Sequence, residues 1–240
     1  MKQILTALLV MLTWLSTSSG ARAAEFSISP TRIQLAPGDL AGSVTITNDG
    51  DETVTVQVET FAWRRSESIA DLDPTRDLIA VPPFFDVGPG QRQIVRVGLR
   101  RPGSPDVETA YRVVLSEVPN TDLASGLGIQ FALRLSLPVF VTPPGAVPDP
   151  QINLARGAGG YRLAVNNRGN AHIRILSLKI QDPRNGETVA RADQPVYLLA
   201  GQQREIDVPA AERNAAALPL DATIIAQTSA GEMTLTANAR

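Results

Sequence analysis

One stretch of the chain, residues 127–141, restricts the fold more than any other. Its odd positions are apolar without a break: Leu127, Ile129, Phe131, Leu133, Leu135, Leu137, Val139 and Val141. Because a β-strand directs alternate side chains to opposite faces, this pattern predicts one long strand with a continuous apolar face. Strands usually run to about 5–6 residues. A strand of about twice that length either crosses into a second domain or keeps part of its apolar face for a partner. The alternative is a central sandwich strand that packs on a single core.

The N-terminus is typical of a processing signal. Lys2 provides the positive start, residues 4–15 are mostly apolar, and Ala21-Arg22-Ala23 has small residues at the spacing that signal peptidase recognises. The apolar run is shorter than the about 20 residues that span a bilayer. We therefore expect residues 1–23 to be a cleaved signal peptide. The mature chain, starting near Ala24, should be exported and should not insert into a membrane.

Composition narrows the class of the mature chain. Without Lys2 and Arg22, the 22 basic residues become 20 against 24 acidic ones, a net charge of −4 that gives no support for nucleic-acid binding. The chain has no cysteine, but a mature chain of about 215 residues can bury adequate cores without disulfides and suits two domains of roughly 100 residues each. Eighteen glycines, eighteen prolines and many short Val/Ile/Thr runs indicate all-β domains.

Short alternating runs separated by turn residues fill the first half of the mature chain. The predicted strands are 26–35, 43–48, 54–63, 77–81, 91–99 and 110–118, followed by the long strand. Pro30 marks an edge or a change of pairing, and Pro82-Pro83 ends the fourth strand, where we expect an edge position or a cis bond. This number and spacing of strands predict a seven-stranded immunoglobulin-like sandwich.

Four prolines make residues 142–151 a stiff connection and the best domain boundary. We therefore expect one domain over residues 24–143 and another over residues 144–240. The strands predicted in the second domain are 161–165, 172–180, 196–199, 205–208, 222–227 and 233–236. They indicate a second, less regular sandwich. No periodic helix follows the signal peptide, and no internal repeat is present.

Catalytic chemistry has little support. His172 is the only histidine, and we interpret it as a surface or half-buried residue rather than a base. Without cysteine, a histidine cluster or a Gly-rich phosphate loop, neither a metal site nor a nucleotide site is indicated, so we expect no cofactor. The acidic residues gather in turns such as Asp49-Gly50-Asp51, Asp71 and Asp73. Solvated turns are the simpler interpretation, and a loop calcium site is the alternative.

Three arginines are candidates for binding a charged partner: Arg32 in the first strand, Arg112 in the strand before the long one, and Arg134 in the long strand. Arginine in a sandwich strand usually points to solvent. If two of these residues converged in a cleft, their guanidinium groups would form a fork-shaped receptor for a carboxylate.

Several motifs of the first domain occur in order and with loop-compatible spacing. They are Ser29-Pro30-Thr31-Arg32, the strand 57–63, Leu78-Ile79-Ala80-Val81-Pro82-Pro83, Gly88-Pro89-Gly90-Gln91, Arg96-Val97, Glu108 with Tyr111-Arg112, Leu115-Ser116-Glu117-Val118-Pro119, and residues 135–143. With these motifs the first domain resembles the periplasmic chaperones of the chaperone–usher pathway, the PapD-like proteins that assemble pili and fimbriae. The second domain is similar to theirs in length and strand content more than in motif.

The resemblance implies two immunoglobulin-like β-sandwich domains in a boomerang arrangement with a cleft between them. In that family the G1 strand, which corresponds to the long strand here, fills the gap left by the missing strand of a pilus subunit. By position, Leu127, Ile129, Phe131, Leu133 and Leu135 would be the donor side chains. The implied partners are pilus or fimbrial subunits and an outer-membrane usher, and no nucleotide is needed. The free chaperone would cap this edge by dimerising or by leaving the segment mobile.

The resemblance also implies that two basic residues hold the C-terminal carboxylate of the subunit. Arg32 matches the first. The second, a lysine near the end of G1, falls at about Pro138 here, which departs from the family pattern. This departure suggests the archaic or alternative branch. We expect Arg112, whose strand neighbours G1, to replace the lysine, with Arg134 as the second choice.

The leading hypothesis is a periplasmic, non-enzymatic chaperone. It would bind, fold and cap pilus subunits by donor-strand complementation and deliver them to the usher. The alternative is a secreted two-domain structural or adhesive surface subunit. Such a subunit should carry an N-terminal donor extension, whereas this chain enters its first strand within a few residues of the predicted cleavage site. An enzyme, such as a glycan-binding hydrolase, ranks third, since paired carboxylates can lie anywhere in a sandwich.

Overall fold

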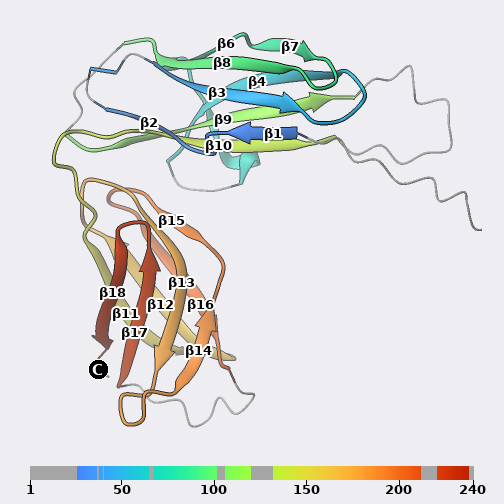
Figure 1. Ribbon diagram of the computed structural model, residues 1–240. Helices are drawn as coiled ribbons and strands as arrows, with labels where there is room; N and C mark the ends of the chain where they lie inside the picture. The colour runs from blue at the N-terminus through green and yellow to red at the C-terminus, as the bar shows by residue number, and fades with distance from the viewer. Residues whose placement is uncertain are drawn as a thin grey trace, which may run out of the picture.

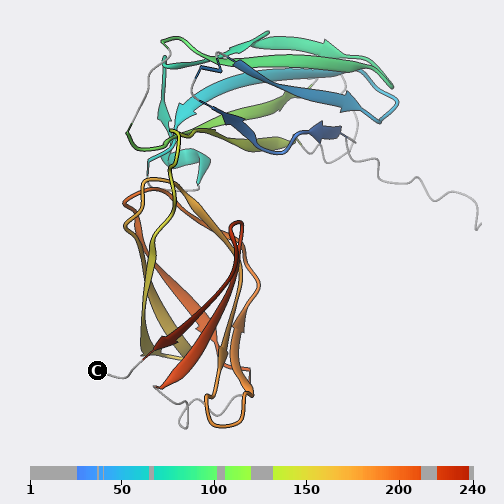
Figure 2. The ribbon, with the colours of Figure 1, turned by 60° about the vertical axis from the view of Figure 1, so that its left-hand side comes forward.

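The computed structural model describes residues 26–36, 38–39, 41–64, 68–101, 106–119, 132–211 and 221–237. Regular structure in these ranges is almost entirely β, and the only helical element described is one 3-10 turn, η1 (Ile69–Asp71). The strands form two β-sandwiches that lie at a large angle to each other, so the molecule is bent (Figures 1 and 2). This arrangement confirms the predicted fold class. None of the described helical residues forms a helix that could cross a membrane.

The first sandwich consists of two sheets that face each other across an apolar core. One sheet has the strand order β1-β3-β8-β6, and the other has the order β2-β10-β9-β4-β5, with β7 also paired to β4. The strands are β1 (Phe26–Ser29), β2 (Ile33–Leu35), β3 (Ala41–Asn48), β4 (Val54–Ala62), β5 (Asp73–Pro74), β6 (Leu78–Val81), β7 (Phe84–Val87), β8 (Arg92–Leu99), β9 (Thr109–Val118) and β10 (Arg134–Val141). Five of the predicted strands recur with closely similar bounds as β3, β4, β6, β8 and β9, and the short β5 and β7 are not among the predicted strands.

Proline marks the point where the chain changes sheet. The segment 26–35, predicted as one strand, is two: β1 pairs with β3 in the first sheet, and β2 pairs in parallel with β10 in the second. Pro30 lies between them, and its peptide bond with Ser29 is cis. The bond between Val81 and Pro82 is also cis, which confirms the expectation for the end of β6.

Strand β9 is buried on both faces. Tyr111, Val113 and Leu115 belong to the core of the first sandwich, as their alternation predicts. The side chains between them, including Arg112 and Val114, are also buried. The second face is covered because it lies on the side of the sheet where the second domain packs, which the local pattern alone does not reveal.

The second sandwich has the same two-sheet construction. One sheet has the order β11-β12-β16, and the other has the order β14-β13-β17-β18, with β15 paired to β13. The strands are β11 (Pro150–Gly157), β12 (Gly160–Asn167), β13 (Ile173–Gln181), β14 (Thr188–Ala192), β15 (Val196–Leu198), β16 (Gln203–Pro209), β17 (Ala222–Thr228) and β18 (Gly231–Ala237). Strands β11 and β14 were missed. The prolines before β11 favour a linker over a strand, and the alternation of Ile152 and Leu154 is too short to outweigh them. Both side chains pack against the core of this sandwich.

The long strand predicted over residues 127–141 is described only in part. Strand β10 covers its last eight residues, 134–141. Residues 120–131 lie outside the described part of the chain, and with them Leu127, Ile129 and Phe131. Within the described strand, the odd positions Leu137, Val139 and Val141 belong to the core of the first sandwich.

Candidate functional site

The sheet that contains β9 and β10 has a second face, directed away from the core of its own sandwich. Because Leu137 and Val139 lie in the core, strand alternation places Pro138 and Phe140 on this second face. The same alternation places Arg112 there. We call this surface, together with Trp63 at the end of β4, the inter-domain face. Its apolar cluster joins first-domain residues to Leu199 and Tyr197 of the second domain.

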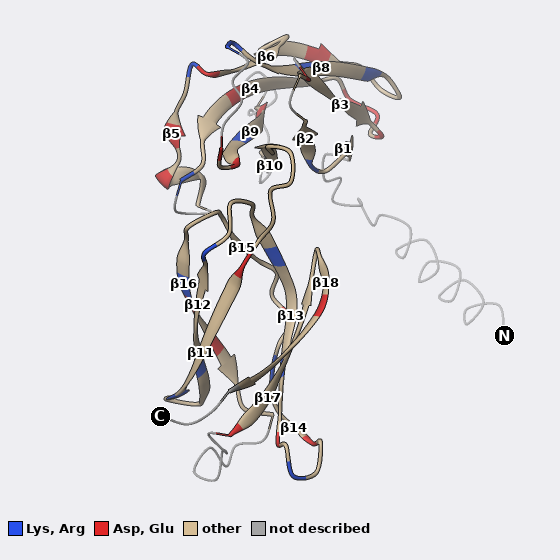
Figure 3. Cartoon of the chain, turned by 90° about the vertical axis from the view of Figure 1, so that its left-hand side faces the viewer, with Lys and Arg blue, Asp and Glu red and all other residues tan. Residues whose placement is uncertain are grey.

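Aromatic rings close the junction between the domains. The Trp63 ring lies 5.9 Å from that of Phe140 and meets that of Tyr197 edge-on at 5.3 Å, measured between centroids. Phe140 stacks almost parallel on His172, with the centroids 3.6 Å apart. Phe140 is 0% exposed. This cluster therefore holds the end of the second sandwich against the sheet of the first, and Figure 3 shows β15 at that end.

A buried carboxylate also links the two domains. Glu108, just before β9, accepts hydrogen bonds from the backbone N–H and from Nδ1 of His172, at 2.8 and 2.7 Å, and from Oγ1 of Thr142 at 2.7 Å. Burial alone raises the pKa of the Glu108 carboxyl. The hydrogen bonds from His172 and Thr142, with the electrostatic attraction of His172, outweigh burial, so the net pKa lies below the ordinary 4.5. His172 as a whole residue is half-buried, as expected, while its side chain is only 8% exposed and contacts the first domain.

Two of the three candidate arginines lie on either side of Pro138. In the antiparallel pair of β9 and β10, Arg112 is the direct partner of Pro138. On the other side of β10, Ile33 pairs with Val139, so the preceding residue, Arg32, lies at the level of Pro138. With strands about 4.8 Å apart, the backbones of the two arginines are separated by roughly 10 Å. Arg112 and Arg32 therefore flank Pro138, and the expected replacement of the family lysine by Arg112 stays a prediction.

The two flanking arginines differ in their surroundings. Arg32 is exposed. Arg112 is only 7% exposed, and its guanidinium carbon lies 3.6 Å from the centroid of the Trp63 ring. Such stacking restricts the guanidinium plane and partly compensates its burial through the cation–π interaction.

Arg134 does not join this pair. It lies four residues before Pro138 in β10, which is about 13 Å along the strand. Its guanidinium makes an exposed ion pair with Glu59 at 3.8 Å. Arg134, the second candidate to replace the family lysine, therefore lies on the same face of the sheet as Arg112 but pairs with Glu59, away from Pro138.

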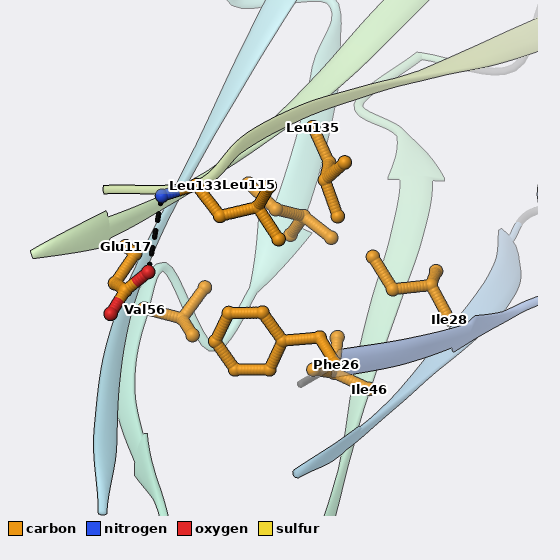
Figure 4. A pocket seen from close by; sticks show the side chains of 8 residues that line it. All are labelled: Phe26, Ile28, Ile46, Val56, Leu115, Glu117, Leu133 and Leu135. Atoms are coloured by element: carbon orange, nitrogen blue, oxygen red, sulfur yellow. Dashed lines mark hydrogen bonds between the residues drawn. The ribbon is translucent and has the colours of Figure 1, made fainter. Parts of the chain in front are cut away.

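Of the five expected donor side chains, the structure describes Leu133 and Leu135. Both are half-buried and line a small apolar pocket at the end of their own sandwich, shown in Figure 4. The other residues that line it are Phe26, Ile28, Ile46, Val56, Leu115 and Glu117. Backbone N–H of Leu133 donates to the Glu117 carboxylate at 3.1 Å, and its carbonyl accepts from the Glu117 N–H at 2.8 Å. These two residues therefore lie at the start of β10, Leu133 just before it and Leu135 within it, and the donor role of the whole set stays a prediction.

Sequence reasoning missed the second domain's part in this region. Arg174 and Tyr197 are direct partners in the pair of β13 and β15, and the guanidinium carbon of Arg174 lies 5.2 Å from the Tyr197 ring centroid. Because Arg174 alternates with Ile173 and Ile175, the sequence indicates that its side chain points away from the core of the second sandwich. Only the packing of the two domains shows that this side faces the first domain. Among the described residues, no group of three or more His, Cys, Asp or Glu side chains is placed to hold a metal ion.

Comparisons with solved structures agree with this architecture. The CsuC–CsuE chaperone–tip adhesion subunit complex from archaic chaperone–usher Csu pili of Acinetobacter baumannii matches with 20% identity and a TM-score of 0.63, over 89% of this chain and 98% of that one. The SafA pilin–SafB chaperone complex of Salmonella enterica matches with 14% identity and a TM-score of 0.64, over 90% and 98%. The CupB2 chaperone of Pseudomonas aeruginosa matches with 14% identity and a TM-score of 0.60, over 89% and 100%.

At these identities the structures establish the fold alone, and no curated protein matches the sequence. The family is established by a sequence model. Residues 25–147, about half of the chain, match the model of the PapD N-terminal domain of pili and flagellar-assembly chaperones. That range includes every first-domain motif that carried the resemblance. The chain therefore belongs to the PapD-like family of pilus-assembly chaperones, whose members are periplasmic and are not enzymes.

Proposed function

We propose that this chain captures pilus or fimbrial subunits in the periplasm by donor-strand complementation and delivers them to an outer-membrane usher. The observation that carries the proposal is the pair of arginines, Arg32 and Arg112, on either side of Pro138. In this proposal residues 1–23 are removed on export, residues 24–143 form the subunit-binding domain, and residues 144–240 form the second domain.

The two arginines suit the C-terminal carboxylate of a subunit. A guanidinium group binds a carboxylate with two parallel hydrogen bonds, and two such groups on neighbouring strands offer donors from both sides. Arg112 is held against Trp63 before any ligand arrives, so less conformational entropy is lost on binding. Arg32 is exposed and can approach from the other side of Pro138.

The edge of β10 suits strand addition. Throughout its length β10 is paired with β9, but β2 covers its other edge only from Val139 to Val141. In the described part of the chain, residues 134–138 therefore have no strand on that side. An unpaired edge offers backbone donors and acceptors to an incoming strand, while the alternating side chains supply specificity. The apolar alternation continues before β10 through Phe131, Ile129 and Leu127, which would enter the groove of the subunit.

A separate surface is available for the usher. Ile79, Val81 and Ile94 are 42%, 55% and 55% exposed and point away from the core on the outer face of β6 and β8, and Phe84, 57% exposed, is nearby in β7. Exposed apolar groups of this kind often mark protein interaction sites. In the proposed cycle this face docks on the usher while the free edge of β10 and the two arginines at Pro138 hold the subunit. Val81→Asp should then impair delivery without impairing capture.

The test is expression of the full chain with a C-terminal tag, followed by fractionation and purification from the periplasm. The proposal expects a mature protein that starts near Ala24, together with a co-purified subunit identified by mass spectrometry as a pilin with an incomplete sandwich. An uncleaved cytosolic chain, or a periplasmic chain that binds no subunit, would contradict it. A chain found polymerised on the cell surface would favour the alternative of a structural subunit. Size measurement of the free protein would show whether it caps itself as a dimer.

A further inference from the structure

We propose that Arg174, a residue of the second domain, completes the carboxylate site, so that arginines from both domains hold the terminus of the subunit. This inference rests on the proposed function and extends it, because the two arginines at Pro138 both come from the first domain. Three features of Arg174 support this role: its direction, the aromatic ring that it shares with Arg112, and its buried Nε, which has no hydrogen-bond partner.

The direction of Arg174 follows from strand alternation. Its neighbours Ile173 and Ile175 are core residues of the second sandwich, so Arg174 lies on the outer side of β13. Its direct partner across the strands is Tyr197, which therefore lies on the same side. Tyr197 contacts Trp63 of the first domain, so this side of β13 and β15 is the side that meets the inter-domain face. Figure 3 shows a basic segment at the end of β13 nearest the first domain.

Two cationic groups from different domains share one aromatic ring. The guanidinium carbons of Arg174 and Arg112 lie 5.2 and 5.8 Å from the centroid of Tyr197. Like charges at such a junction repel each other, and the aromatic faces offset this repulsion only in part. An anion bound near both guanidinium groups would remove the repulsion, and a carboxylate matches their planar geometry.

Two buried hydrogen-bond donors near the Tyr197 ring have no acceptor within the described residues. The Nε of Arg174 is buried and has no hydrogen-bond partner, and the same is true of the indole Nε1 of Trp63, a residue only 3% exposed. Buried donors are nearly always paired in folded proteins, so such exceptions call for an explanation. A carboxylate has about four acceptor sites and can satisfy donors from more than one side chain.

The acidic side chains of the first domain on this side are already engaged. Glu59 pairs with Arg134, and Glu108 is bound by His172 and Thr142. Within the described residues, Arg174 makes no ion pair with any carboxylate of its own chain. A partner's carboxylate can supply the acceptor that these donors lack, and the proposed function provides one in the free carboxylate at the end of a subunit.

The experiment is a double-mutant cycle on the full chain. Its probe is the subunit that co-purifies with the wild-type chaperone, used with its native terminus and with a Gly-Ser extension that displaces the carboxylate. Arg174→Gln keeps hydrogen-bond donors but removes the charge. It should weaken capture of the native subunit at least about tenfold, since a bond to a charged group is lost. It should leave capture of the extended subunit unchanged, while Arg174→Lys should have an intermediate effect.

The control is Arg191→Gln, because Arg191 is an exposed arginine of the same domain whose partner is Asp193. Arg191→Gln should change capture of neither the native subunit nor the extended one. If Arg174→Gln weakens capture of both subunits equally, or of neither, Arg174 does not contact the carboxylate and the inference is wrong. If the extended subunit binds the wild-type chain as tightly as the native one, the carboxylate anchor and this inference are wrong, while capture by the donor strand stands. If neither subunit binds the wild-type chain, the proposed function itself is wrong. Melting curves of each variant separate these results from misfolding.

Discussion

The carboxylate of Glu108 in the first domain accepts a hydrogen bond of 2.7 Å from Nδ1 of His172 in the second. Both side chains are buried, with 2% and 8% of their surfaces exposed. Because Thr142 of the connecting segment donates to the same carboxylate, one acidic group ties together the first domain, the connection and the second domain. The hydrogen bonds that join the two domains here therefore depend on the ionised state of Glu108.

This contact predicts a pH-dependent component of stability. The pKa of Glu108 is lower in the folded protein than the ordinary 4.5, so the stability that the ionised carboxylate contributes is complete above about pH 4.5. It should be lost as the pH falls from 4.5 through the lowered pKa. Urea unfolding of the wild-type chain and of Glu108→Gln, repeated between pH 7 and pH 3, measures this component. The free energies of the two proteins should converge at the acidic end, and a constant difference across that range would contradict the prediction.

A second prediction concerns the exposed arginine at Pro138. Arg32→Ala should leave the melting temperature close to that of the wild type, because an exposed side chain contributes little to folding. It should abolish detectable subunit capture, since the loss of one partner of a buried charge pair costs on the order of 2–5 kcal/mol. The measurement is co-purification of the subunit from periplasmic extract. Undiminished capture would remove Arg32 from the carboxylate anchor.

A third prediction separates Arg112 from Arg134, which share one face of the sheet. Arg112→Ala should lower both capture and stability, with about 0.5–2 kcal/mol of the stability loss coming from the cation–π contact with Trp63. Arg134→Ala removes an exposed ion pair with Glu59 and should cost at most about 1 kcal/mol. Capture should survive in the Arg134 variant. The reverse order of effects on capture would restore Arg134 as the second anchor.

A fourth prediction tests the aromatic junction. Phe140→Ala removes a fully buried ring that stacks on His172 and should destabilise the protein by about 3–5 kcal/mol. Because the ring touches both domains, small-angle scattering should also report a wider distribution of inter-domain angles. Val139→Ala, one residue away but directed into the core of the first sandwich, is the matched control. It should reduce stability without changing the shape of the molecule.

How far the sequence predicts this structure depends on the range of the interaction. Strand alternation between core and exposed positions is local, and it predicts β3, β4, β6, β8 and β9 of the first domain with closely similar bounds. The Glu108–His172 contact joins residues 64 positions apart, and no local pattern marks them as partners. Likewise Arg112 and Arg134 have the same chemistry and the same face, and only the register of β9 against β10 places one of them at Pro138.

The central claim is that the apolar residues before β10 serve a partner rather than their own core, and one substitution tests it. Phe131→Asp places a charge on the expected donor face, whereas Leu137→Asp places it on the same strand face inside the core, where Leu137 is 4% exposed. Burial of a donor side chain such as Phe131 in a subunit should contribute roughly 1.5–3 kcal/mol.

The decisive measurement is the melting temperature of the two variants together with their capture of the subunit. Phe131→Asp should melt close to the wild type and capture no subunit, while Leu137→Asp should unfold. A Phe131→Asp protein that is as badly destabilised as Leu137→Asp, or that still captures the subunit, would contradict the donor-strand function.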